Sequence, residues 1–318
     1  MTLGAGWSKL GKKTTIGCIG RSSPGTCSTT ATPTQPPSST TSSGKSLAAS
    51  LHLSRSSSTG GGTPSMAGVL GRVFPLGRAV EELGDRRSSR FSPAPSTLIL
   101  GPARCNKSAL LVQAAVSEAA ADGQVLFMAP QKLQRLPPGV HGMPTPSSSA
   151  LENVRFLYAQ NECELTGYLA SLHKIPAGDR PSLIVIDDLH FFSHGQNIDA
   201  ASQLMNAARI LSLAQESAEF CSNSPECRVA RPCGVLAAWT LGSGALKKDE
   251  VVPFARSLCH YVWSVHRKAK NSGGEEYHLV EEEQGRTCTV EYSLRLSPSP
   301  HLLLRQVALE ERGAQGPK

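Results

Sequence analysis

The sequence predicts an α/β protein in which helices cover a mostly parallel sheet. From residue 97 onward, short apolar runs alternate with segments of helical periodicity, the order expected of a parallel sheet covered on both faces. After residue 260 the hydrophobic period shifts toward two, which indicates a meander of antiparallel strands. The first strand and first helix are joined by a segment that resembles a phosphate-binding loop.

Residues 97–100 (Thr-Leu-Ile-Leu) form the first predicted strand, because a short apolar run is what a strand buried on both faces requires. Residues 108–121 form the first predicted helix, since they are rich in good helix formers. The polar members beyond its first turn, Gln113, Ser117 and Glu118, share one face. This helix is therefore expected to be mostly buried.

The rest of the domain repeats this alternation. The further strands of the parallel part are predicted at residues 124–128, 154–158, 183–186 and 234–238, and helices at about 165–172 and 199–220. Asp199 is a candidate N-cap of the second of these helices. Strands of period two are predicted at 261–265, 277–281 and 287–294.

The net charge of +7 is concentrated near the N-terminus. Residues 1–65 contain six Lys or Arg, no Asp or Glu, and 27 Ser or Thr, so the remainder carries 26 basic and 25 acidic residues. Such a polar segment cannot bury enough apolar surface to offset its chain entropy, and residues 1–95 are predicted to be a disordered tail. An organellar transit peptide, or an extension upstream of a start at Met66, are the alternatives. The globular domain is expected at 96–300, followed by a C-terminal strand and tail at 301–318.

Membrane and disulfide-rich classes are not favoured. No apolar run approaches the roughly 18–20 residues that a membrane-spanning helix needs, so no membrane partner is expected. The nine cysteines include no C-x-x-C pair, which is typical of reduced intracellular thiols. Cys221, Cys227 and Cys233 are too widely spaced for a typical structural zinc site, and a fourth ligand, Cys259 or His260, would be distant.

The segment between the first strand and first helix reads Gly101, Pro102, Ala103, Arg104, Cys105, Asn106, Lys107, Ser108. Its spacing matches the ATP-binding pattern G-x-x-x-x-G-K-[ST], with the required strand before it and helix after it. Backbone N–H groups and the helix N-terminus would surround the phosphates of ATP. Lys107 would supply a positive charge to the β- and γ-phosphates, and the Ser108 hydroxyl would ligate Mg²⁺. A chance match at a strand–helix turn is the alternative.

One position departs from the pattern, and two carboxylates extend the candidate site. Asn106 stands where glycine is expected, and Asn tolerates a positive φ better than most residues. Asp187 follows the apolar strand 183–186, and in a parallel sheet this end faces the same crevice as the loop. Asp187 would hold Mg²⁺, usually through water. Asp188 is either a catalytic residue that polarises the attacking water or a solvated turn residue.

These segments together resemble one family. They are residues 97–113, the strand Val125-Leu126-Phe127 with 133–139 after it, 154–158 and 183–188. Over residues 97–300 the chain is similar to the small RecA-family recombinase paralogue that pairs with a SWIM-type zinc-finger protein in the Shu-type complex. The resemblance implies a RecA-like P-loop core and a nuclear protein that binds ATP, Mg²⁺ and single-stranded DNA. It also implies weak DNA-stimulated ATPase activity in homologous recombination repair, and partnership with the zinc-finger protein and with RecA-family recombinases.

Two departures from that family favour an alternative. Recombinases of this class place a catalytic Glu just after the second strand, where this chain reads Ala129-Pro130-Gln131-Lys132. Their separate helical DNA-binding domain is also missing. The alternatives are therefore a non-hydrolysing interaction scaffold with a vestigial nucleotide site and, more distantly, a mitochondrial P-loop ATPase addressed by the N-terminal tail.

DNA contacts are expected in loops that follow the later strands. The basic candidates are Lys247, Lys248, Arg267, Lys268 and Lys270, which would neutralise phosphates without reading sequence, unless they are simply solvated turn residues. Trp239, Trp263 and Tyr261 are candidates for base stacking, although aromatic residues in strands are more often core. Residues 91–94 (Phe-Ser-Pro-Ala) match the loose F-x-x-A pattern through which recombinases dock on one another.

Overall fold

The computed structural model describes residues 72–74, 96–195, 198–223, 232–242, 246–268, 275–283, 286–296 and 299–311. Within these ranges one ten-stranded sheet runs in the order β3-β10-β9-β8-β7-β1-β6-β5-β2-β4. The α/β prediction, with a mostly parallel sheet and antiparallel strands toward the C-terminus, is confirmed.

The parallel part of the sheet holds six strands in the order β7-β1-β6-β5-β2-β4. Their bounds are β1 Ser96–Pro102, β2 Val125–Ala129, β4 Val154–Tyr158, β5 Leu183–Ile186, β6 Gly234–Leu241 and β7 Tyr261–Arg267. All six predicted strands of this part are present, and β1 lies near the middle between β6 and β7. Because the strands are parallel, their carboxyl ends meet at one edge of the sheet.

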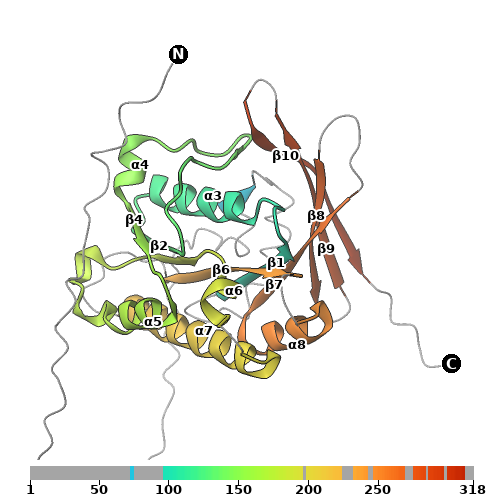
Figure 1. The fold of residues 1–318 in the computed structure, drawn as a ribbon. Coiled ribbons are helices and arrows are strands. Elements are labelled where there is room, and N and C mark those ends of the chain that lie inside the picture. The colour runs from blue at the N-terminus through green and yellow to red at the C-terminus, as the bar shows by residue number, and fades with distance from the viewer. Residues whose placement is uncertain are drawn as a thin grey trace, which may run out of the picture. The chain divides into compact units, whose positions relative to one another are not determined.

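Helices cover both faces of this sheet (Figure 1). On one face lie α3 (Lys107–Ala120) and α4 (Ser148–Glu152); on the other lie α5 (Glu162–Ala170), α6 (Leu189–Ser193), α7 (Ala200–Ser222) and α8 (Lys248–Leu258). Asp199 caps α7, since its carboxylate accepts a hydrogen bond from the backbone N–H of Ser202 at 3.0 Å. This N-cap was predicted from the sequence.

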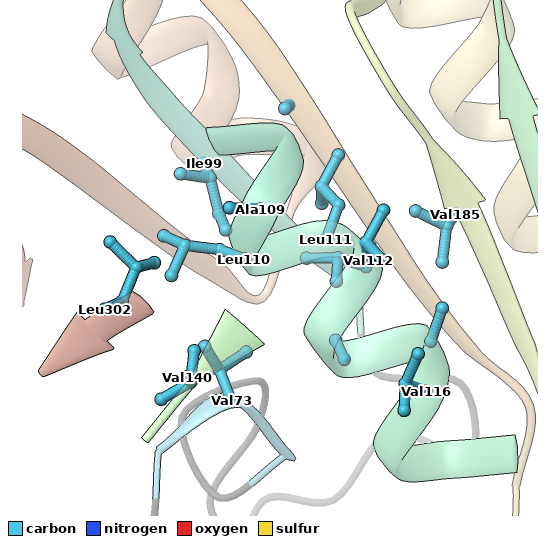
Figure 2. Packing of buried hydrophobic residues seen from close by; sticks show 14 of the residues in the cluster. Val73, Ile99, Ala109, Leu110, Leu111, Val112, Val116, Val140, Val185 and Leu302 are labelled. Carbon is cyan, nitrogen blue, oxygen red and sulfur yellow. The ribbon is translucent and has the colours of Figure 1, made fainter. Parts of the chain in front are cut away.

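The strands carry apolar side chains to two separate clusters. Ile99 of β1 packs with α3, whereas its neighbours Leu98 and Leu100 pack with α7 and α8 on the opposite face. This alternation explains why the central strands are continuous apolar runs instead of alternating polar and apolar residues. The first cluster extends well beyond α3: Figure 2 shows Leu110, Val140 and Leu302 gathered within it.

The C-terminal strands extend the sheet in antiparallel order. They are β8 (Glu275–Glu283), β9 (Arg286–Arg295) and β10 (His301–Glu311), and β10 then pairs in parallel with the two-residue strand β3 (Gly139–Val140). Gln113 of α3 secures β3, because its Oε1 accepts the N–H of Val140 at 3.0 Å. The predicted C-terminal strand is thus part of the same sheet as the rest of the domain.

A short stretch inside the predicted tail belongs to the core. Val73 and Phe74 are each 1 % exposed, and the Phe74 ring lies 5.8 Å from that of Tyr292. Arg72 forms an ion pair with the buried carboxylate of Glu118 at 3.4 Å. The predicted tail boundary at residue 95 therefore needs correction at these three positions, because two adjacent apolar residues found a place in the core that the polar composition around them concealed. None of the described helices is both long enough and apolar enough to cross a membrane.

Candidate nucleotide-binding site

The predicted phosphate loop connects the carboxyl end of β1 to the first turn of α3. Residues 101 and 102 finish the strand, residues 103–106 form the turn, and α3 begins at Lys107. No acidic residue lies in the first turn of α3, and the side chain of Asn106 makes no capping hydrogen bond. The amino end of this helix thus retains the backbone donors and the positive dipole that attract an anion.

Gly101 is required by close packing under the loop. A Cβ added there would lie 2.9 Å from the Cys105 sulfur and 2.9 Å from Cβ of Val265, closer than such atoms approach. The Cys105 thiol is itself buried, and desolvation by this burial raises its pKa. The first glycine of the motif therefore holds the loop against β7.

Two residues of the loop adopt the left-handed backbone conformation. Arg104 has φ of 60° and Asn106 has φ of 61°. The Asn at position 106 thus takes the conformation that the motif's usual glycine adopts at low cost, and Asn is among the side chains that tolerate it best.

Substitutions at position 106 should separate strain from ligand binding. We expect Asn106→Gly to keep the free energy of unfolding within about 1 kcal/mol of wild type, and Asn106→Ala to lower it by about 1–2 kcal/mol, since a Cβ without a local hydrogen-bonding group is penalised in this conformation. Removing the side chain next to the phosphates should also tighten ATP binding several-fold in Asn106→Gly. Urea unfolding and titration with a fluorescent ATP analogue measure the two effects. Equal stability of the two variants would contradict the strain argument.

Lys107 folds back over the loop. Its buried ammonium donates hydrogen bonds to the carbonyl oxygens of Gly101 at 3.0 Å and Pro102 at 2.7 Å, and lies 3.6 Å from the Cys105 sulfur. In this arrangement the ammonium group neutralises the loop's own carbonyl dipoles. A bound phosphate would have to draw Lys107 away from these two acceptors.

Ser108 and Asp187 meet across the crevice, 79 residues apart in sequence. The Ser108 hydroxyl donates a hydrogen bond to Oδ1 of Asp187 at 3.1 Å. Asp187 follows β5 directly, and its backbone N–H donates to the carbonyl of Met128 at 2.8 Å. Burial of the Asp187 carboxylate raises its pKa to about 6, with Ser108 and Lys107 opposing the shift and the negative charge of Asp188 adding to it.

This pair suits Mg²⁺. A hydroxyl and a carboxylate supply the oxygen ligands that Mg²⁺ prefers, and Mg²⁺ commonly takes one or two protein ligands together with substrate phosphates. A buried carboxylate whose charge is poorly solvated, as the raised pKa of Asp187 shows, would also be stabilised by a cation. Ser108 and Asp187 are the residues that would hold the ion.

Asp188 is held in place instead of being a freely solvated turn residue. It has φ of 59°, is half-buried, and its Oδ1 accepts a hydrogen bond from the Thr240 hydroxyl at 3.1 Å. Thr240 lies near the end of β6 and was missed by the sequence analysis, because a lone threonine near the end of an apolar strand carries no recognisable motif. Beyond Asp188, Nδ1 of His190 lies 2.8 Å from Nε2 of Gln203 on α7.

A cavity of about 580 Å³ opens beside Asp188, away from the phosphate loop. Asp188 and Thr240 line one side of it, and Glu162, His190 and Asn206 are among its other lining residues. No residue of the loop 101–108 lines it, consistent with the loop being filled by its own lysine. Asp188 therefore lies between the candidate phosphate site and this cavity.

The structure gathers most of the basic residues predicted to bind DNA. Lys247 precedes α8 and Lys248 begins it, so these two lie at a helix N-terminus instead of the loop predicted for them. Nζ of Lys248 lies 3.2 Å from Nε2 of His266 in β7, which brings the start of α8 to the predicted hairpin. Arg267 ends β7 and pairs with Glu275 of β8 at 3.2 Å, so part of its charge is neutralised.

Lys268 is exposed next to that pair, and Lys270 lies outside the described residues, as does the F-x-x-A segment at 91–94. Trp239 and Trp263 are 1 % and 4 % exposed, so both belong to the core, which removes them as candidates for stacking on bases. Within the described part of the chain, no three His, Cys, Asp or Glu side chains gather to hold a metal ion. Cys221 and Cys233 are described and buried, whereas Cys227 is outside the described ranges.

Comparison with known proteins adds a similarity of fold. No protein-family model matches the chain, and no curated protein matches it significantly. Among solved structures it is similar to one described as an "ATPase Domain", at 13 % sequence identity with a TM-score of 0.45. That match covers 67 % of this chain and 86 % of the other. At this distance the similarity is recorded without further argument, and the functional reasoning rests on the site.

Proposed function

We propose that this protein binds ATP with Mg²⁺ at the loop 101–108 and acts as a weak ATPase. The observation that carries the proposal is the hydrogen bond between Ser108 and Asp187 at the carboxyl edge of the parallel sheet. It joins a hydroxyl that follows Lys107 to a carboxylate that follows a buried strand, which is the arrangement that phosphate-bound Mg²⁺ requires.

The binding step follows from the groups around the loop. The free amino end of α3 would accept the phosphates, and Lys107 would exchange two carbonyl acceptors for phosphate oxygens. Mg²⁺, when bound, would neutralise charge that develops on the phosphates. Asp188, fixed by Thr240, is the carboxylate placed to orient an attacking water.

The resemblance to recombinase paralogues extends the proposal. In this extension the chain is a nuclear recombination mediator whose partners are a SWIM-type zinc-finger protein, RecA-family recombinases and single-stranded DNA. The basic residues around the β7–β8 hairpin and the start of α8 would contact DNA phosphates, which gives binding that weakens steeply with salt.

A non-hydrolysing scaffold is the second candidate, because specific observations favour it. Lys107 is tied to its own loop, Asn106 replaces the usual glycine, and the stretch after β2 offers no carboxylate. In this case ATP would bind and stiffen the domain for its partner without being cleaved.

Two measurements on the full chain separate these candidates and test DNA contact. ATP binding with phosphate release that rises when single-stranded DNA is added supports the ATPase. ATP binding without phosphate release supports the scaffold, and absence of Mg²⁺-dependent ATP binding would refute both.

For DNA contact, the double substitution Arg267→Ala with Lys268→Ala should weaken single-stranded DNA binding and reduce the salt slope by up to about two, since each of the two side chains would neutralise one phosphate. The matched control is Arg155→Ala with Lys174→Ala, which removes the same charge from exposed positions elsewhere. An unchanged affinity and slope in the first variant would remove the hairpin from the DNA-binding surface.

A further inference from the structure

A pair of cysteines lies at the amino end of β6, at the opposite edge of the sheet from the candidate nucleotide site. Cys221 is in the last turn of α7, and Cys233 comes immediately before β6. Both are buried, with exposed fractions of 2 % and 1 %, and both belong to the same apolar cluster. The two thiols interact directly, because that of Cys233 hydrogen-bonds that of Cys221.

The backbone around the pair fixes this approach. The N–H of Cys233 donates to the hydroxyl of Ser222, the residue next to Cys221, at 2.8 Å. That hydroxyl in turn donates to the carbonyl of Ala218 within α7, also at 2.8 Å. The start of β6 is thereby tied to the last turn of α7 through a residue adjacent to one of the cysteines.

The two sulfurs differ in their surroundings. The guanidinium of Arg180 lies over the Phe220 ring at 4.6 Å and is close enough to favour a negative charge on Cys221. The hydrogen bond from Cys233, followed by this positive charge, lowers the pKa of Cys221 despite its burial. The pKa of Cys233 is raised, because it donates to its neighbour and is desolvated. A thiolate near a cation is the reactive form of cysteine, and a second thiol in contact is the group that resolves its oxidised form.

We propose that Cys221 and Cys233 form a reversible disulfide that locks the end of α7 to the start of β6. In the first step the Cys221 thiolate attacks a hydroperoxide: an S–O bond forms, the O–O bond breaks, and the departing alkoxide or hydroxide takes up a proton. In the second step the Cys233 sulfur attacks the resulting sulfenic acid, an S–S bond forms, and the S–O bond breaks with loss of water. Two thiols are oxidised by two electrons, and one hydroperoxide is reduced to an alcohol, or to water if it is hydrogen peroxide, with a further water released.

Peptide mapping of the full-length protein tests the pairing. Trypsin is expected to give one peptide of residues 210–228 that contains Cys221 and Cys227, and another of residues 229–247 that contains Cys233. After treatment with hydrogen peroxide, we expect these two peptides to be linked in wild type, in Cys227→Ser and in Cys163→Ser. The link should be absent in Cys221→Ala and Cys233→Ala, and dithiothreitol should reverse it. A link that survives in Cys221→Ala but not in Cys227→Ser would overturn the assignment, as would exposed Cys163 becoming fully oxidised while the peptides remain separate.

Thermal unfolding gives a second readout that does not depend on cysteine variants. Closing so short a loop should raise the Tm of the oxidised protein by roughly 6–12 °C over that of the reduced protein. The rise should vanish with dithiothreitol and persist in oxidised Cys227→Ser. A Tm that falls on oxidation would show that the pair is not arranged for a bond, and would count against the proposal whether or not ATP binds.

Discussion

Asp187→Asn is expected to stabilise the ligand-free protein at pH 8 and to abolish its Mg²⁺-dependent affinity for ATP. The pKa of Asp187 is raised from 3.8 to about 6, mainly because the carboxylate is buried. The folded state therefore holds this proton more tightly than the unfolded state does. The resulting stabilisation is complete below about pH 4 and is lost as the pH rises through 6.

The size of the effect follows from the same shift. Above pH 7 the buried negative charge costs about 3 kcal/mol relative to its neutral form, an upper value for a group that also accepts a hydrogen bond. Asparagine carries no charge, so we expect Asp187→Asn to exceed wild type by about 2–3 kcal/mol at pH 8 and by less than about 1 kcal/mol at pH 4. Urea unfolding across this range measures the difference. Asp179→Asn is the matched control, because it removes an exposed carboxylate.

The ligand-binding half of the prediction has the opposite sign. Loss of the carboxylate should weaken ATP binding at least tenfold with Mg²⁺ and change it little in the presence of a chelator. Wild type should also bind Mg²⁺ and ATP less tightly below pH 6, where Asp187 takes up a proton. A variant that is less stable at every pH, and yet binds ATP with Mg²⁺ normally, would place the ion elsewhere.

Lys107→Ala should lower the affinity for ATP by roughly 30–100-fold and eliminate phosphate release. Its ammonium is the charged side chain placed to pair with the phosphates, and charge-assisted hydrogen bonds contribute about 2–3 kcal/mol. The same substitution leaves the carbonyls of Gly101 and Pro102 without this donor, which should lower the free energy of unfolding by about 1–3 kcal/mol.

Lys107→Met separates the two consequences, because it keeps the apolar stem and removes the charge. We expect it to bind ATP as weakly as Lys107→Ala does while unfolding closer to wild type. Lys132→Ala, an exposed lysine after β2, should change neither property. If Lys107→Met and wild type release phosphate at equal rates, the ATPase is refuted; if they also bind ATP equally, so is the nucleotide site.

The fold could be predicted where local pattern and burial agree. The strands around β1, the helix α3 and the hairpin β7–β8 all follow from hydrophobic period. Helix α8 was missed, because Pro253 lies within it and lacks the N–H that a helix interior normally uses. It forms nonetheless, since Val251 and Ala255 are fully buried against the sheet.

The candidate site was predictable in proportion to its sequence locality. Lys107 and Ser108 lie within one motif, and Asp187 ends a recognisable strand, so three partners could be named in advance. Thr240 and the cavity beside Asp188 depend on three-dimensional proximity between β5, β6, α6 and α7. No spacing rule in a single sequence conveys that proximity.

The place of β1 in the sheet has a consequence for how the chain folds. Its neighbours are β6 and β7, so Ser96 pairs with Val235 and Thr97 with Tyr261. During synthesis, the central strand waits for its two partners until most of the domain has left the ribosome. Both of its edges, and the apolar side chains Leu98 to Leu100, remain available to other chains throughout that interval. A sheet with such high contact order is expected to fold slowly, and to need either a chaperone or an early-binding partner to reach the native state in good yield.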